Sequence, residues 1–302
     1  MIRLDAATVL LQWAGGGLLF LWVTTRRREV GIGYGWLMRG VYLLMALGAL
    51  AAGIAYQPSV VRDLASLLVA VATGVALVVS VLRRRAGVAG QRAEAARKRQ
   101  RVAAMLPGQG DNPSGLAETG IERAEQAFDD DAPEFPPGLD LVAPAIAVVG
   151  LVAAGLDAAV GGGAGTAALS VARVVVGAVF LGAVSDAMLL GHWYLVQPGL
   201  ARGPLLELVR LTGLVWPVEV ALLLVPTGMV SVWSGSIDDG YGGMLGWFWA
   251  ASAITTIVLV VVTRAALKER YYSAVMAATG LLYLAILTAF GTDLVARAIL
   301  AG

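Results

Sequence analysis

Ionisable side chains lie inside two neighbouring apolar stretches of this 302-residue chain, and they are its best candidates for chemistry. An ionisable residue within an apolar segment of membrane-spanning length is costly, so its presence indicates a function or a specific partner. The two stretches are residues 168–196 and 204–232. Their ionisable residues are Arg173, Asp186 and His192 in the first, and Glu207, Arg210 and Glu219 in the second.

The short connector QPGLARGP, residues 197–204, predicts that the two stretches form antiparallel neighbouring helices. With a rise of about 1.5 Å per residue, Asp186 and Glu219 are expected near the middle of the membrane. Neither carboxyl group has an obvious cation at its own depth. Since burial favours the protonated form of a carboxyl group, one hypothesis is a proton path through Asp186 and Glu219, with Arg210 as a third member.

Pairing between opposite charges is the alternative hypothesis. Asp157 and Arg173 are expected at one depth, and we predict that they form a structural pair. Arg210 is predicted to pair with Glu207, three residues earlier on the same helix, or with Asp186. Such pairs give each charge a partner in a medium of low dielectric constant.

His192 is the only histidine of the chain, and Trp193 and Tyr194 follow it. These two residues are typical of the aromatic belt at the level of the lipid headgroups. The stretch 168–196 is longer than the hydrocarbon core requires, so its end is expected to project and present all three side chains near Arg202. Aromatic faces beside a cation predict a site for an anionic lipid headgroup or a quinone.

Metal and haem sites are not indicated by one histidine and no cysteine. A haem within a bundle needs two axial ligands, and Met188 lies on the same helix face as His192, so the two cannot ligate opposite sides. Zinc needs three or four ligands, and His192 with Glu207 supplies two. We therefore predict no cofactor, no metal and no catalytic residue.

Long apolar helices must position these residues. The chain is 58% hydrophobic and 14% charged, whereas about a quarter of the residues of a soluble domain are charged. Apolar runs recur at about 20 residues, the length that crosses a hydrocarbon core. The predicted fold is an all-α polytopic transmembrane bundle of about eight spans. These spans are residues 6–24, 36–56, 64–82, 141–160, 168–196, 204–232, 244–263 and 271–290.

Basic residues predict the orientation of the spans. Most of the 22 Lys and Arg lie in alternate connections, TTRRRE, LRRRAG to RKRQR, GLARGP and TRAALKER, whereas the intervening connections hold only Arg62. Basic connections stay in the cytoplasm, so both termini are predicted outside and the number of spans must be even. Arginines follow the first run and do not precede it, which indicates a retained span and not a cleaved signal.

Residues 83–138 differ in composition from the rest of the chain, with a basic first half and an acidic second half. We interpret them as a cytoplasmic linker whose halves attract each other, or alternatively as a docking site for a cytoplasmic partner. The linker separates a predicted three-span bundle, 1–82, from a five-span bundle, 139–302. The net charge of +1 indicates no nucleic-acid partner.

The stretch 204–232 is also predicted to be irregular. Pro217 and Pro226 each lack an N–H, so each leaves a carbonyl one turn earlier without its helical partner. Irregular backbone at membrane depth is tolerated where it is buried or lines a cavity. Frequent small residues elsewhere, as in AGGGLLF and VVGLVAAGLDAAVGGG, are expected to allow close approach of helices.

The segment AVSDAMLLGHWYLVQPGL, the following PLLELVRL and the later AVMAATGLLYL resemble a set of uncharacterised bacterial polytopic membrane proteins that carry a MLLGHWYL-x-x-P segment. The resemblance covers roughly the last half of the chain. It implies that His192, Trp193, Tyr194 and Pro198 belong to one shared element. It implies no activity.

The sequence therefore predicts a multi-pass protein of the bacterial inner membrane. Its predicted role is that of a non-catalytic binding or accessory subunit of an envelope or respiratory assembly, with the bilayer and other membrane subunits as partners. The first alternative is a proton-coupled transporter or channel that uses Asp186, Glu219 and Arg210. The second is a membrane redox or quinone-binding protein with His192 at its site.

Overall fold

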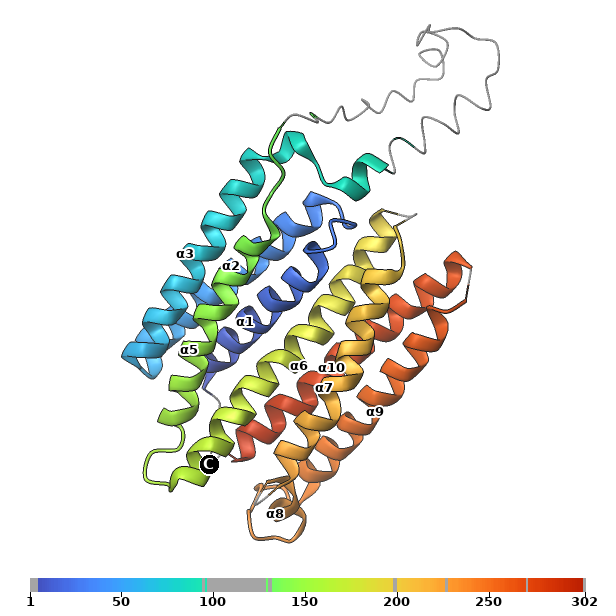
Figure 1. Ribbon diagram of the computed structural model, residues 1–302. Helices are drawn as coiled ribbons and strands as arrows, with labels where there is room; N and C mark the ends of the chain where they lie inside the picture. Colours follow the sequence, from blue (N-terminus) through green and yellow to red (C-terminus); the bar gives the residue numbers. More distant parts are fainter. Residues whose placement is uncertain are drawn as a thin grey trace, which may run out of the picture.

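The computed structural model describes residues 5–93, 96, 129, 132–197, 200–225, 228–269 and 271–300. Long helices with roughly parallel axes form a bundle, and the described part of the chain contains no strand (Figure 1). The predicted all-α class is therefore confirmed.

The helices follow the predicted spans closely. The first group has three long helices and, at the start of the linker, a short 3₁₀ turn; the second has a 3₁₀ turn at the end of the linker, five long helices and a short one. The first group is α1 (Ala6–Thr25), α2 (Ile32–Tyr56), α3 (Val60–Leu82) and η1 (Arg84–Ala86). The second group is η3 (Pro137–Leu141), α5 (Val142–Asp157), α6 (Ala164–Val196), α7 (Gly203–Leu224), α8 (Met229–Trp233), α9 (Met244–Ala266) and α10 (Tyr272–Leu300).

In the described part of the chain, seven helices are long and apolar enough to cross a membrane: α1, α2, α3, η3 with α5, α6, α9 and α10. α7 has a similar length of 22 residues but carries Glu207, Arg210 and Glu219, and it is not one of the seven. Two predicted boundaries were wrong. The stretch 204–232 does not form one helix, because α7 ends at Leu224 and α8 is separate, and the last helix continues beyond residue 290 to Leu300.

The outer surface of the bundle is apolar, and several polar side chains are buried inside it. Leu44 and Leu287 are 69% and 68% exposed, whereas Arg39 and Asp186 are at most 1% exposed. A soluble protein would not leave many large apolar side chains in contact with water. The distribution is the one expected for helices whose outer faces contact lipid.

α1 lies at the centre of the packing and contacts α2, α5 and α6. A Cβ atom at Gly16 would lie 1.8 Å from the backbone oxygen of Ala178 in α6, so the two helices approach at backbone distance. This confirms that small residues permit close helix approach. Helices on both sides of the linker thus share one packed core, and the division into bundles 1–82 and 139–302 stays a prediction.

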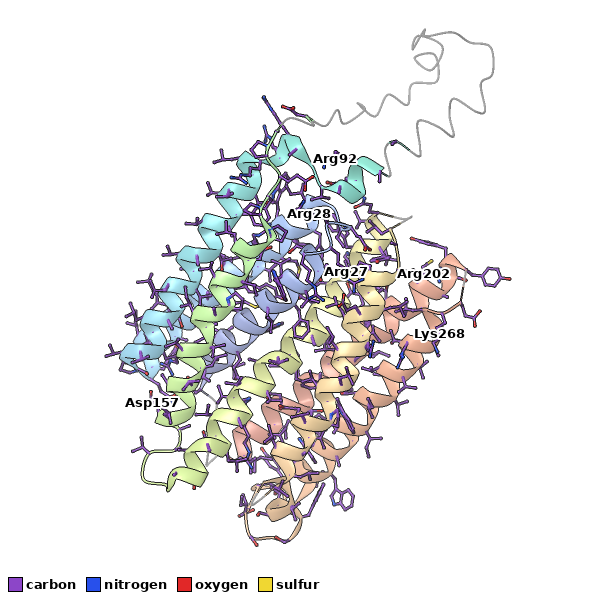
Figure 2. The ribbon with its side chains drawn as sticks, in the orientation of Figure 1. Arg27, Arg28, Arg92, Asp157, Arg202 and Lys268 are labelled. Carbon is purple, nitrogen blue, oxygen red and sulfur yellow. The ribbon has the colours of Figure 1, made fainter. Side chains whose placement is uncertain are left out.

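Both ends of the described chain lie at the same end of the bundle. α10 ends at the end of the bundle that carries α8 (Figure 1), and Asp5 and Leu300 line one common cavity. The labelled residues Arg27, Arg28, Arg92, Arg202 and Lys268 gather at the opposite end, far from Asp157 (Figure 2). Arginine-rich connections therefore share one end of the molecule, as the charge pattern predicts.

Glu134 holds the two described ends of the linker together at this basic end. Its carboxylate forms an ion pair with Arg28 at 3.1 Å and another with Arg92. Its backbone oxygen accepts a hydrogen bond from Arg83 at 2.8 Å. Most of residues 83–138, and with them the predicted docking of a partner, lie outside the described residues.

Candidate functional site

An open cavity of about 860 Å³ lies at the end of the bundle that carries the termini. Its walls come from the first turns of α1 and α3, the end of α5, the first half of α6 and the end of α10. Its charged lining residues are Asp5, Arg62, Asp157, Arg173 and Arg297.

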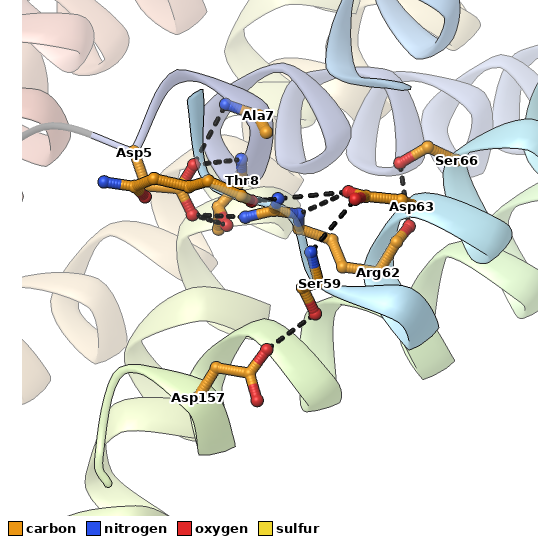
Figure 3. A network of polar contacts seen from close by, with 9 residues as sticks. Asp5, Ala7, Thr8, Ser59, Arg62, Asp63, Ser66 and Asp157 are labelled. Atoms are coloured by element: carbon orange, nitrogen blue, oxygen red, sulfur yellow. Dashed lines mark hydrogen bonds and ion pairs between the residues drawn. The ribbon is translucent and has the colours of Figure 1, made fainter. Parts of the chain in front are cut away.

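One wall is a polar network in which a single arginine pairs with two carboxylates (Figure 3). Asp5 caps the start of α1 by accepting the backbone N–H groups of Ala7 and Thr8 at 3.1 and 3.3 Å. Arg62 is buried in α3 and pairs with Asp5 at 2.7 Å and with Asp63 at 3.0 Å. Because Arg62 has two carboxylate partners, it supplies no spare positive charge to the cavity.

Asp157 stands on the same side of the cavity with a different partner. It is the last residue of α5, and its Oδ2 accepts a hydrogen bond of 2.6 Å from the hydroxyl group of Ser59 (Figure 3). No Lys or Arg of the described residues forms an ion pair with it. The Asp157 carboxylate is exposed and therefore available to a cation.

Arg173, on α6, turns toward the end of α7. Its Nε donates to the carbonyl oxygen of Leu222 at 2.8 Å and its Nη2 to that of Val225 at 3.3 Å. The Leu222 carbonyl lies four residues before Pro226, which has no N–H to offer it. Arg173 satisfies this carbonyl, which explains why the guanidinium group lies where it does.

The predicted pair between Asp157 and Arg173 was therefore wrong. Each side chain is held by other partners, Ser59 for the aspartate and the α7 carbonyls for the arginine. Both line one cavity without an ion pair between them. Among the described residues, Arg173 forms no ion pair with any carboxylate.

Behind Arg173, the end of α10 supplies a second arginine with a buried partner. Arg297 Nε donates to both carboxylate oxygens of Asp293, at 2.9 and 2.8 Å, and its Nη2 donates to the backbone oxygen of Arg173 at 2.8 Å. Gly177 of α6 makes room for this group, since a Cβ there would lie 2.3 Å from Arg297 Nη2 and 2.5 Å from Asp293 Oδ1.

Glu219 and Gln12 place polar atoms without hydrogen-bond partners near Arg173 and Arg297. Both carboxyl oxygens of Glu219 are buried and have no hydrogen-bond partner, and Glu219 interacts electrostatically with Asp293, Arg297 and Arg173. Gln12 donates to the Val174 carbonyl oxygen at 2.7 Å, but its buried Oε1 has no partner.

Asp186 is buried elsewhere, between α2 and α6. Its Oδ1 accepts a hydrogen bond from the Tyr42 hydroxyl group at 2.9 Å, and its Oδ2 has no partner. Arg210 is exposed and pairs with neither Asp186 nor Glu207, so both predicted partnerships of Arg210 were wrong. Asp186, Glu219 and Arg210 do not share one site.

Glu207 has other partners at the basic end of the bundle. Its carboxylate pairs with Arg26 at 2.7 Å and with Arg27 at 2.8 Å. The turn after α1 thus brings two cations to Glu207.

The segment around His192 is only partly presented at the surface. His192 is exposed, and its Nδ1 lies 3.0 Å from the Tyr283 hydroxyl group. Trp193 packs edge-on against Tyr34, with ring centres 6.0 Å apart. Tyr194 is buried and donates to the Ala201 carbonyl oxygen, so its predicted presentation at the surface was wrong.

Arg202 lies at the start of α7 and binds the turn between α9 and α10. It donates to the backbone oxygens of Leu267 at 3.3 Å and Tyr271 at 3.0 Å. Arg202 thus joins two connections of the basic end. A lipid or quinone site at His192 stays a prediction.

Sequence reasoning missed two pairs of charges inside the bundle. Arg39 and Asp140 form a buried pair, with Nε–Oδ1 and Nη2–Oδ2 distances of 2.8 and 2.7 Å. Asp293 and Arg297 lie beyond the predicted end of the last span. The signals were present, namely a lone arginine in the apolar stretch 36–56 and an Asp-x-x-x-Arg spacing that permits an i,i+4 pair.

No three His, Asp or Glu side chains of the described residues are grouped as a metal site would require. Comparison of the chain with protein-family models, curated proteins and solved structures gave no match. The resemblance in residues 183–200 therefore stays a prediction, and the cavity has to be interpreted from its own chemistry.

Proposed function

We propose that the protein is an integral membrane protein in which α7 is an eighth span and the basic end faces the cytoplasm. Seven described helices of spanning length, the shared position of Asp5 and Leu300 at one end and the arginine-rich opposite end support this proposal. Residence in the bacterial inner membrane and association with other membrane subunits are part of the same proposal.

We further propose that the cavity binds a small zwitterionic solute with a carboxylate and an ammonium group, such as an amino acid. One observation carries this proposal. Among the described residues Arg173 forms no ion pair with a carboxylate and Asp157 forms none with a Lys or Arg, and both line the same cavity. A zwitterion would supply to each the charge that it lacks.

Size and chemistry agree with such a ligand. Pockets for small molecules commonly measure about 300–1,000 Å³, and this cavity measures about 860 Å³. Arginine binds carboxylates through a planar array of donors. The aspartates on the opposite wall, Asp5 and Asp157, disfavour polyanions such as phosphate.

The experiment is a binding titration with the purified protein in lipid nanodiscs. Alanine, leucine, glutamate and lysine serve as zwitterionic probes, and acetate and methylammonium each carry one of the two charges. We expect an amino acid to bind more tightly than either single-charge probe. Arg173→Gln and Asp157→Asn should each weaken binding by about 10- to 100-fold, because a hydrogen bond to a charged group contributes about 1.5–3 kcal/mol.

Arg27→Gln is the matched control, since it removes an arginine at the opposite end of the bundle. It should leave affinity unchanged. Absence of binding by every amino acid tested, or equal affinity in the wild type and both cavity variants, would refute the proposal.

Proton-coupled transport of this solute is the second candidate, supported by the buried, unpartnered carboxyl group of Glu219 next to the cavity arginines. The measurement is uptake of radiolabelled amino acid into proteoliposomes driven by a pH gradient. Binding without uptake would favour a binding or accessory subunit instead.

A further inference from the structure

Arg173 and Arg297 lie between the cavity and the carboxyl group of Glu219. Both line the cavity, and both interact with the buried carboxyl group of Glu219. Asp293 also interacts with Glu219 and is paired with Arg297. Any anion that binds these arginines from the cavity therefore acts on the carboxyl groups behind them.

The charges that face Glu219 can be assigned helix by helix. α10 supplies Asp293 and Arg297, and α6 supplies Arg173. α1 and α8 contain no charged residue, and the only charged residue of α9 is Arg264 in its last turn, at the basic end. Two cations and two carboxyl groups thus form one group of interacting charges that is neutral when both carboxyl groups are ionised.

We propose that the carboxylate of a solute at Arg173 and a proton on Glu219 bind cooperatively, so that the cavity takes up the solute together with a proton. The inference rests on the proposed solute binding and specifies how that site is regulated. No bond is made or broken apart from the O–H bond that Glu219 forms with a proton from water.

Electrostatics provides the reason. Burial and the neighbouring Asp293 carboxylate favour the protonated form of Glu219, whereas Arg297 and Arg173 favour the ionised form. A solute carboxylate adds one negative charge next to Arg173 and offsets its attraction for Glu219. In a medium of low dielectric constant this change is large, and the added charge is compensated when Glu219 holds a proton. Because the effects of two coupled binding events on each other are equal, protonation of Glu219 must in turn strengthen the binding of the solute.

The test measures alanine affinity across the range from mildly acidic to neutral pH, in which alanine stays zwitterionic. We expect affinity to fall as the pH rises, by at most about tenfold per pH unit for one coupled proton. Glu219→Gln, a neutral mimic of the protonated acid, should keep the high affinity and lose the pH dependence. Glu207→Gln, which removes a carboxylate at the other end, should behave as the wild type.

Calorimetry of the wild type in buffers with different ionisation enthalpies adds a measurement that needs no variant. We expect the binding of alanine to take up protons, at most one per alanine bound, within the pH range where the affinity changes. If alanine binds with an affinity that is independent of pH and without proton uptake, this inference fails while the proposed function stands. A pH dependence that persists in Glu219→Gln would also overturn it. If no amino acid binds at all, the proposed function itself fails.

Discussion

Arg39 and Asp140 show what a charge requires inside an apolar bundle. Asp140 accepts two hydrogen bonds from the guanidinium group, and Arg39 Nη1 donates to Ser80 Oγ at 3.1 Å. The guanidinium group also lies 4.2 Å from the centre of the Phe135 ring. The pair joins α2 to η3, the turn that precedes α5, and so holds the chain to the bundle where the linker ends.

We predict that Asp140→Asn lowers the free energy of unfolding by about 3–5 kcal/mol, because it leaves the Arg39 charge buried without its partner. Denaturant unfolding in detergent measures this change. Arg27→Gln is the control, since Arg27 is 42% exposed and pairs near the surface, where an ion pair contributes about 0–1 kcal/mol. Equal, small effects of both substitutions would contradict the prediction.

Asp239 caps the turn that begins α9. It accepts backbone N–H groups from Gly243 at 2.8 Å and from Tyr241 and Leu245 at 2.9 Å each. These hydrogen bonds, that of Gly243 first, hold the pKa of Asp239 below its ordinary value. A carboxylate with a lowered pKa stabilises the folded turn above the pKa of the unfolded chain, and this stabilisation is lost as the pH falls through the lower, folded value.

We therefore predict that the amide groups of Gly243 and Leu245 lose their protection from hydrogen exchange only below the ordinary titration range of aspartate. Protection factors corrected for the intrinsic exchange rate measure this. Asp239→Ala should remove the protection at neutral pH. Asp238→Ala should not, because Asp238 accepts only the N–H of Gly240. Protection that is unchanged in Asp239→Ala would show that the carboxylate does not hold the turn.

At the scale of elements, the contact between α1 and α6 depends on glycine. A Cβ at Gly182 would lie 2.2 Å from the carbonyl carbon of Gly16 and 2.4 Å from its oxygen. Backbone atoms cannot move aside as the end of a flexible side chain can. The two helices would have to separate, and with them the two halves of the shared core.

Gly182→Ala is predicted to destabilise the bundle by at least about 1–3 kcal/mol, as overpacking does. Gly74→Ala is the matched control, because a Cβ there meets nothing within 4 Å. Since alanine is favoured over glycine within a helix by about 1 kcal/mol, this control should be neutral or stabilising. Thermal unfolding of both variants compares them. A stable Gly182→Ala variant would mean that α1 and α6 can separate without loss.

At the scale of the whole molecule, the placement of charged connections predicts the orientation in the membrane. A fluorescent reporter that folds only in the cytoplasm should emit light when inserted in residues 94–128 and stay dark when fused after Gly302. Alkaline phosphatase, active only outside, should show the opposite pattern. Fluorescence from the fusion after Gly302 would contradict the proposed eight crossings.

The helices could be predicted because the information is local. Runs of apolar residues and the basic residues after them fall in the observed helices and at one end of the bundle, and α6 has the excess length expected of residues 168–196. The predicted last span ends at residue 290, and Asp293 and Arg297 lower the hydropathy of the residues that follow. Their mutual pairing removes much of the cost of burying them, and the helix continues.

Partnerships between charges could not be derived from depth along single helices. Depth predicts that Asp157 pairs with Arg173, and helical spacing predicts that Glu207 pairs with Arg210. The actual partners are Ser59, the α7 carbonyls and the two arginines after α1. The hydropathy pattern predicts where each helix begins and ends, and so the position of a residue along the helix axis. The rotation of each helix and the choice of its neighbours depend on contacts between distant parts of the chain, and these contacts leave Arg173 and Asp157 facing one cavity.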